Sequence, residues 1–428
     1  MSHRITNKIC VGKKSKNTLV INNIQVSIKF IVKCDRVYMT LHFKDHAYIK
    51  LSARICCNKF KSAKILRLGN TSFNLIDDSK CDLKLTLAVD INKITYTIVI
   101  TTDKLNKYMV NITSTNTVTL KTLKALKKLN NYFVSYVDSI TNWWPPVAIA
   151  ASIGVPSYSH PYSYNIINMA FWTTNQGPAD AALLWSQALT YVSSDNPWGQ
   201  TTSEIQQAWI NLYHTNNVRV LVSAFGATDF PTSQGTDPIV VAEQLAVFVI
   251  NNHLDGVDLD WEDSTALENG TGEAWLISCT RRLRQLLPVP YIITHAPQAP
   301  YFMGHVKYPN GGYLTVNAQV GQDINFYNIQ FYNQDSSRYD TYESLFNVSD
   351  GWATNTAVKQ IAVNVPKEKL VVGKGVLPSD VINTGYVPVD QLAEFLRLGV
   401  NDIKGYFGWQ FSSDSTGSWS ETLARSFV

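Results

Sequence analysis

Three carboxylic acids at alternate positions, Asp258, Asp260 and Glu262, are the residues whose types and spacing could do chemistry. Apolar Leu259 and Trp261 separate them, and such alternation is typical of a β-strand, where residues two apart share a face. Like charges crowded on one face cannot all ionise cheaply, so at least one carboxyl is expected to stay protonated near neutral pH. A proton held on Glu262, at the solvent-facing end of the strand, would make it a general acid.

The same spacing also occurs in loops that bind calcium through several carboxylates. Here the interleaved residues are Val, Leu and Trp, and the run follows an expected helix over 239–251. A buried strand fits this pattern better than an exposed loop. We therefore predict neither a metal ion nor a cofactor at these acids.

The elements that would position these acids are predicted in the second part of the chain, where short apolar strands alternate with amphipathic helices. Strands are expected at 147–153, 165–172, 219–225, 256–261, 291–295, 325–332, 370–376 and 404–410. Helices are expected at 179–192, 203–213, 239–251, 273–286 and 390–398. Eight strands in about 286 residues match a (β/α)8 TIM barrel, whose chemistry lies at the C-terminal ends of the strands. One irregularity is that only 11 residues separate the first two expected strands.

Composition divides the 428-residue chain near residue 142. Residues 1–142 hold 24 Lys and Arg against 8 Asp and Glu, a net charge of +16, while the remainder carries −12. All 11 tryptophans lie in the acidic part. Two segments so different in composition are expected to be two domains. The absence of any apolar run of about 18 residues excludes a membrane-spanning helix.

The basic part alternates apolar and polar residues and is rich in Val, Ile, Thr and Tyr, which predicts an all-β N-terminal domain, a sandwich or jelly-roll. Apolar residues at spacings of three and four then predict an amphipathic connector helix over 119–140. The expected domains are 1–118, a connector or linker at 119–144, and a barrel at 145–428. The basic domain could bind an anionic surface or partner, or its lysines could be a solvated face; both stay open.

At these positions the sequence resembles glycoside hydrolase family 18, the chitinases of plant and fungal type. Asp255, Asp258, Asp260 and Glu262 match the family pattern D-x-x-D-x-D-x-E at the fourth strand. Further matches on other strands are Ser223 on the third, in a stretch resembling S-x-G-G with Phe225 in place of the first Gly, then Gln330, Tyr332 and Asn333 on the sixth, and Trp409 on the last. The stretch 295–300 resembles the segment after strand five. No resemblance is seen for residues 1–142.

The resemblance implies a retaining hydrolase of β-1,4 links between N-acetylglucosamine units that uses the substrate's own acetamido group. Glu262 would protonate the glycosidic oxygen, Asp260 would orient the acetamido N–H, and Asp258 would lie deeper and interact with Asp260. Tyr332 would donate to the acetamido group and Trp409 would stack under the sugar. The remaining residues expected to bind substrate are Gln330, Asn333, Ser223, Phe171 and Asp255.

Several alternatives stay open at this stage. The partner would be chitin or another glycan containing N-acetylglucosamine, so an endo-β-N-acetylglucosaminidase of the same family is an alternative, as is an attachment protein whose barrel mainly binds glycan. Only 27 residues separate strands seven and eight, which predicts an open groove and endo cleavage. An extracellular, wall-associated or particle-associated location is expected, although no standard signal peptide is seen. The oligomeric state is not predicted.

Overall fold

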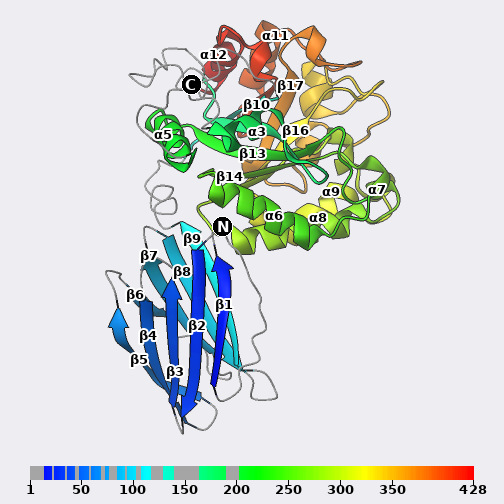
Figure 1. The fold of residues 1–428 in the computed structure, drawn as a ribbon. Helices are drawn as coiled ribbons and strands as arrows, with labels where there is room; N and C mark the ends of the chain where they lie inside the picture. Colours follow the sequence, from blue (N-terminus) through cyan, green and yellow to red (C-terminus); the bar gives the residue numbers. More distant parts are fainter. Residues whose placement is uncertain are drawn as a thin grey trace. The chain divides into compact units, whose positions relative to one another are not determined.

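The computed structural model describes the backbone of nine strands between residues 14 and 116, and residues 129–138, 163–188 and 202–428 in detail. The chain divides into two compact units, Met1–Lys124 and Ala125–Val428. Each unit is described by itself below (Figure 1).

The first unit contains two antiparallel sheets, one with the order β1-β2-β3-β4-β5 and one with the order β6-β7-β8-β9. Their strands are β1 Lys14–Ile21, β2 Ile24–Lys33, β3 Arg36–Phe43, β4 Tyr48–Cys56, β5 Lys59–Leu68, β6 Phe73–Ile76, β7 Lys84–Ile91, β8 Ile94–Thr102 and β9 Tyr108–Asn116. A sandwich or jelly-roll arrangement of this unit stays a prediction.

The second unit is a closed barrel of eight parallel strands, as the sequence predicted (Figure 1). Neighbouring strands pair in parallel around the ring, and pairing of β10 with both β11 and β18 closes it. The strands are β10 Tyr132–Val137, β11 Ile166–Thr173, β13 Arg219–Gly226, β14 Gly256–Trp261, β15 Ile292–His295, β16 Phe326–Gln330, β17 Leu370–Gly375 and β18 Gly405–Trp409. The two-residue β12, Gly177–Pro178, pairs antiparallel with the end of β11.

The first barrel strand corrects the sequence analysis. The connector helix expected over 119–140 is wrong for Tyr132–Val137, which form β10. Phe133 and Val137 fit the helical spacing of four, whereas Val134 and Tyr136, two residues apart, pack in the barrel interior with residues of the other strands. The barrel therefore includes residues that we had assigned to a linker, and the strand expected at 147–153 lies outside the described residues.

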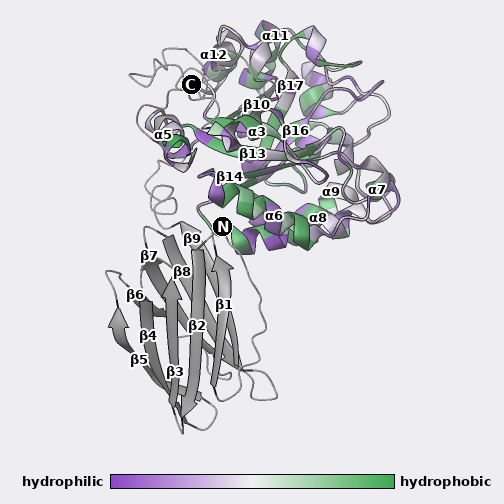
Figure 2. Cartoon of the chain, viewed as in Figure 1, coloured by the Kyte–Doolittle hydropathy of each residue, from purple (hydrophilic) through white to green (hydrophobic). Residues whose placement is uncertain are grey.

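Helices follow the strands and cover the barrel. Their bounds are α3 Asp180–Ser186, α5 Thr202–Thr215, α6 Pro238–Asn251, α7 Ser264–Glu268, α8 Gly272–Leu286, α9 Gly312–Val320, α10 Val358–Ile361, α11 Val389–Leu398 and α12 Ser418–Ala424. In Figure 2, α6 and α8 carry both hydrophobic and hydrophilic colours, as expected of helices with one face on a sheet. The start of α6 is fixed by Asp237, whose carboxylate accepts from the backbone N–H of Ile239 at 2.7 Å, and by Pro238 in the first turn.

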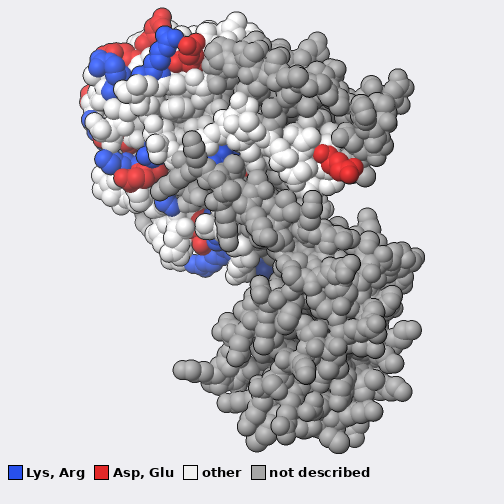
Figure 3. All heavy atoms as spheres, turned by 90° about the vertical axis from the view of Figure 1, so that its left-hand side faces the viewer, with Lys and Arg blue, Asp and Glu red and all other residues white. Residues whose placement is uncertain are grey.

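The interior of the barrel is filled by side chains from alternating strand positions, including Val134, Ile166, Leu221 and Val371, all fully buried. The C-terminal ends of the strands remain open to a cavity described below. Within the ranges that the structure describes, no helix is long and apolar enough to cross a bilayer. On the face drawn in Figure 3, basic and acidic side chains lie in small mixed groups rather than in one field of a single sign.

Candidate active site

Asp258 is the innermost acid of the site and is fully buried on β14. One carboxylate oxygen accepts hydrogen bonds from Tyr136 Oη at 3.0 Å and Ser223 Oγ at 2.8 Å. The other oxygen accepts from Thr294 Oγ1 at 2.5 Å and Asn328 Nδ2 at 3.2 Å. Burial raises the pKa of Asp258, and the hydrogen bonds oppose this rise. The carboxyl thus ties four other strands of the barrel together beneath the site.

Asp260 and Glu262 follow Asp258 on the same face and reach the cavity, so the predicted alternation is confirmed for these three positions. Asp260 Oδ1 accepts from Gln330 Nε2 at 2.9 Å. The Glu262 carboxyl accepts from Gln298 Nε2 at 2.9 Å and from Gln330 Nε2 at 3.4 Å. Two amide side chains therefore hold the orientation of the outer two carboxyls.

The pKa of Asp260 lies well above its usual range, because the carboxyl is buried and faces the charges of Glu262 and Asp258. Burial also raises the pKa of Glu262, against the hydrogen bonds from Gln298 and Gln330. Such a pair releases its protons as a unit. The expectation that one acid stays protonated agrees with the upward direction of both shifts.

A cavity of about 540 Å³ lies over these acids at the C-terminal ends of the strands. Seven of the ten residues singled out from the sequence line it: Phe171, Asp260, Glu262, Gln330, Tyr332, Asn333 and Trp409. They come from β11, β14 and β18 and from the end of β16 and the residues after it. This is the end of the barrel at which enzymes of this fold place their chemistry.

Aromatic rings form one part of the cavity. The rings of Trp409 and Phe171 lie 6.2 Å apart between centroids and are inclined by only 22°. Trp409 also contacts Tyr136 at 6.1 Å. Space for the Phe171 ring depends on Gly226: a Cβ at that residue would lie 2.9 Å from the ring, and its φ of +70° favours glycine. A flat indole face of this kind is suited to packing against the apolar face of a sugar ring.

The Tyr332 hydroxyl is available to a ligand. The side chain is buried to 5% exposure and lines the cavity, and its hydroxyl makes no hydrogen bond within the described part of the chain. Burial and the charges of Asp260 and Glu262 raise the pKa of Tyr332 well above its usual range. The hydroxyl therefore stays protonated and can donate.

The structure places the other three predicted residues outside the cavity lining. Asp258 and Ser223 bond each other beneath it. Asp255 is a correction: it lies before β14, where its carboxylate accepts from the backbone N–H of Val220 at 2.7 Å and meets His214 Nε2 at 2.8 Å. Asp255 therefore holds the N-terminal ends of the strands together and does not reach a ligand in the cavity.

Eight lining residues were not identified from sequence, namely Asp138, Asp180, Ala227, Thr228, Gln298, Asp380, Ile382 and Asn383. Gln298 lies in the stretch 295–300, which was noted only as a resemblance. It is brought to Glu262 by a parallel bridge to Gln330. His295 at the start of this stretch is fully buried between Thr280 and Tyr313. Burial lowers the pKa of His295 to about 3, so the imidazole stays neutral and structural.

The charges around the cavity are of one sign. Among the described residues, the ionisable acids that line it are Asp138, Asp180, Asp260, Glu262 and Asp380, and none of the described lining residues is Lys or Arg. In the part of the chain with placed side chains, no group of three His, Cys, Asp or Glu residues is arranged to hold a metal ion. The arrangement is suited to acid–base chemistry on an uncharged or cationic ligand.

Comparisons with known proteins show which family the chain resembles. The model of the family described as Glycosyl hydrolases family 18 matches residues 130–377, more than half of the chain. An acidic endochitinase of Phaseolus angularis is 24% identical over 312 residues, which are 68% of this chain and 91% of that protein. The crystal structure of a family 18 chitinase from Pseudoalteromonas aurantia is 29% identical, with a TM-score of 0.49, over 69% of this chain and 99% of that one.

A further crystal structure, of putative chitinase A from Streptomyces coelicolor, has a TM-score of 0.50 at 19% identity and covers 70% of this chain and 99% of that one. This likeness shows the shared barrel fold. The family match begins at residue 130, two residues before β10, in agreement with the corrected first strand. With the family pattern at Asp258, Asp260 and Glu262 and a family match over more than half of its length, the chain belongs to glycosyl hydrolase family 18.

Proposed function

We propose that the chain is an endo-acting chitinase that hydrolyses β-1,4 links between N-acetylglucosamine units with retention of configuration. The observation that carries this proposal is the meeting of Glu262, Asp260 and Tyr332 in one cavity: an acid, a carboxyl beside it and a free hydroxyl. An acetamido sugar offers an N–H for a carboxylate and a carbonyl oxygen for a hydroxyl, so the three groups complement it.

Catalysis begins with proton transfer from Glu262 to the glycosidic oxygen. The acetamido oxygen of the substrate attacks the anomeric carbon as the bond to the leaving sugar breaks, which gives an oxazolinium ion. Glu262 then takes a proton from water, whose oxygen attacks the same carbon and reopens the ring. Two displacements at one carbon return the β configuration.

Substrate binding favours one position for the proton that the two outer acids hold. In the free site, burial raises the pKa of both Asp260 and Glu262, and the charges of Glu262 and Asp258 raise that of Asp260 further. An acetamido N–H that donates to Asp260 favours its charged form and so lowers its pKa. The proton is then retained by Glu262, where the leaving oxygen needs it, and the Asp260 carboxylate faces the positive oxazolinium.

The other lining residues hold the sugar. Tyr332 donates to the acetamido oxygen, and Trp409 packs under the ring beside Phe171. Gln330 keeps Asp260 in place and can reach the same sugar. Positioning and electrostatic interactions of this kind commonly lower the activation free energy of an enzyme by several kcal/mol.

The sign of the lining favours an uncharged polymer. Five carboxyl groups, with no Lys or Arg among the lining residues that the structure places, would repel sulfated or uronic-acid polysaccharides in a partly desolvated cavity. Neutral N-acetylglucosamine chains are not subject to this repulsion, and we therefore take them as the substrate class.

The loop between the last two strands supports an open groove. Residues 376–404 contain only the helical turn Pro378–Asp380 and α11, without a further strand. No inserted domain raises that side of the cavity, which supports cleavage inside a long chain rather than from its end.

The test is the digestion of the chitin hexamer with detection of product anomers by NMR. We expect dimers, trimers and tetramers as early products, each with a β-configured new reducing end. An initial α anomer would contradict the substrate-assisted route, and release of monomer alone would contradict endo action. Absence of hydrolysis with retained binding would favour a glycan-binding protein instead.

A further inference from the structure

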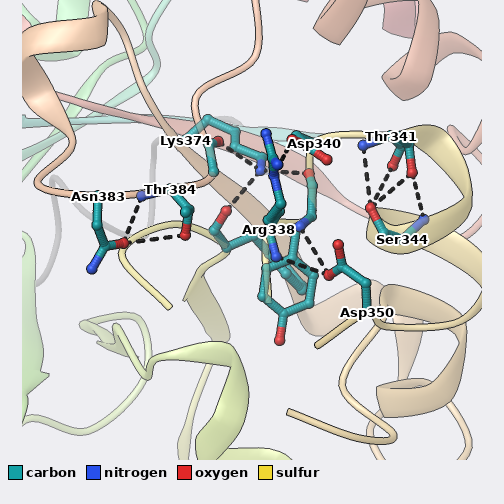
Figure 4. A network of polar contacts seen from close by, with 11 residues as sticks. Arg338, Asp340, Thr341, Ser344, Asp350, Lys374, Asn383 and Thr384 are labelled. Atoms are coloured by element: carbon teal, nitrogen blue, oxygen red, sulfur yellow. Dashed lines mark hydrogen bonds and ion pairs between the residues drawn. The ribbon is translucent and has the colours of Figure 1, made fainter. Parts of the chain in front are cut away.

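Lys374 is fully buried on β17, at the end of the strand that is nearest to the cavity. Its Nζ donates to the backbone carbonyls of Phe331 at 2.7 Å, Tyr339 at 2.8 Å and Gly385 at 2.9 Å. Figure 4 shows the side chain reaching into this group of segments. A neutral amine has only two N–H bonds, so three donated hydrogen bonds require the ammonium form.

Two of these carbonyls belong to the cavity wall. Phe331 precedes Tyr332, and Gly385 ends the segment of residues 382–385, here called the wall loop. Ile382 and Asn383 of the wall loop line the cavity next to Tyr332 and Asn333, to which the loop is bonded. The ammonium therefore joins the two neighbouring segments of this wall from beneath.

The wall loop is bonded to the residues after β16 at further points. The backbone N–H of Asn333 donates to the carbonyl of Thr384 at 2.8 Å, and that of Ile382 donates to Asn333 Oδ1 at 2.7 Å. Asn383 Nδ2 donates to Asp335 at 2.9 Å. Apart from Lys374, each of these bonds is at least partly exposed, so water competes for it.

The backbone of Gly385 also packs closely against Tyr332. Its φ is +95°, and a Cβ at this residue would lie 2.6 Å from Tyr332 Cα. The Gly385 and Tyr332 backbones therefore lie in close contact, so the position of one constrains the position of the other.

The charged groups that face Lys374 are Asp340 and Asp350, and both attract its charge. Asp340 is paired with Arg338 at 2.8 Å, and Asp350 accepts from the backbone N–H of Arg338 at 2.9 Å and of Tyr339 at 3.3 Å (Figure 4). Burial outweighs the attraction and lowers the pKa of Lys374 to about 7. As Lys374 loses a proton within the neutral pH range, it therefore loses one of its three donated hydrogen bonds.

We propose that Lys374 is a positioning residue for the reaction proposed above: its ammonium holds the wall loop against residues 331–333 and so fixes where the Tyr332 hydroxyl meets the acetamido group. Lys374 itself does not line the cavity and touches no substrate. The inference rests on the proposed function only for the role of Tyr332.

The first test compares Lys374→Met with Lys369→Met. Lys369 stands at the other end of the same strand, is half-buried and also donates to two backbone carbonyls, of Gly321 and Ile324. In Lys374→Met we expect amide exchange of Ile382 and Asn333 to be faster and KM for the hexamer to rise, each by about tenfold. Lys369→Met should change neither. Equal exchange and equal KM in Lys374→Met and the parent would overturn the inference.

The second test needs no loss of a buried donor. In the parent protein KM should rise as pH passes from 6 to 8.5, whereas Lys374→Arg, which stays charged, should show a flatter profile. A parent KM that is constant over this range would overturn the inference, even if Lys374→Met fails to fold. Amide exchange can be measured without hydrolysis. A chain without chitinase activity would therefore contradict the proposed function, while faster exchange in Lys374→Met would still support the role of Lys374 in holding the wall loop.

Discussion

Gln330 Nε2 lies 2.9 Å from Asp260 and 3.4 Å from Glu262, so one amide serves both outer carboxyls of the site. The same nitrogen lies 3.0 Å from the carbonyl of Ala296, and because an amide has two N–H groups, the longer contact with Glu262 shares one of them. Hydrogen bonds to the charged forms lower the pKa of both acids against the effect of burial. Gln330 thereby tunes the pair, and it also lines the cavity.

Replacement of this amide should change the pH dependence of activity. In Gln330→Leu the pKa of Asp260 and of Glu262 should rise, because the stabilised charged forms lose a donor. We expect both limbs of the kcat/KM profile to move to higher pH and kcat to fall on the order of tenfold or more. Gln319→Leu, on the exposed face of α9, is the matched control. An unshifted profile with reduced kcat would contradict the tuning role.

In the absence of substrate, the Asp260 carboxyl should lower the free energy of unfolding at neutral pH. Its folded-state pKa is raised, so the folded chain holds a proton that the unfolded chain loses, and stability falls as pH rises from the unfolded pKa through the folded one. Asp260→Asn should therefore increase the free energy of unfolding at pH 7–8, by about 1.4 kcal/mol for each pKa unit involved, and by little at pH 4. Urea denaturation at the two pH values measures this. A gain that is larger at pH 4 would contradict the assignment.

Replacement of Gly226 should weaken ligand binding, in addition to straining the backbone. Gly226→Ala places a Cβ 2.9 Å from the Phe171 ring, which stacks with Trp409, so KM should rise. Gly235→Ala is the matched control: its φ of +72° is similar, but a Cβ there meets nothing within 4 Å. Both variants should lose about 1 kcal/mol of stability from the left-handed backbone. Equal KM in the two variants would show that the Phe171 ring does not support the sugar site.

Phe225 stands where the family pattern has glycine, and its φ is +85°. The ring is fully buried and contacts Trp275 edge-on at 5.8 Å between centroids, which offsets the strain. Phe225→Ala should cost about 3–5 kcal/mol from lost burial. Phe225→Gly loses the same ring but relieves the strain, so it should be more stable than Phe225→Ala by about 1 kcal/mol. Thermal unfolding of both variants decides, and a more stable alanine variant would exclude backbone strain at this position.

The barrel was predictable because seven of its strands are short segments rich in apolar residues and lie between segments with helical periodicity. The first strand was missed since Tyr132–Val137 also fits helical spacing, and only pairing with β11 and β18 decides between the two. Asp255 was assigned to the ligand from the family pattern alone. Strand alternation argues against this, because Asp255 and Asp258 are three residues apart and lie on opposite faces.

The acids were visible from sequence because β14 presents them locally, at alternate positions of one strand. Gln298 could not be found in this way: it reaches Glu262 through a bridge to Gln330, 32 positions along the chain. Lys374 was equally hidden, because a lysine in an apolar strand reveals its role only once the carbonyls around it are known. Contacts between segments that are distant in sequence are thus the part of the site that the pattern leaves out.

Replacement of one carboxyl tests the central claim most directly. The rate of hexamer hydrolysis by Glu262→Gln should be compared with that of Glu268→Gln, whose carboxyl is exposed on α7 and pairs with Lys307. We predict that Glu262→Gln loses at least about 10²–10⁴ of kcat but still binds the hexamer, because the amide cannot supply the proton. The control should keep the parent rate. A Glu262→Gln variant with most of its activity would contradict the account.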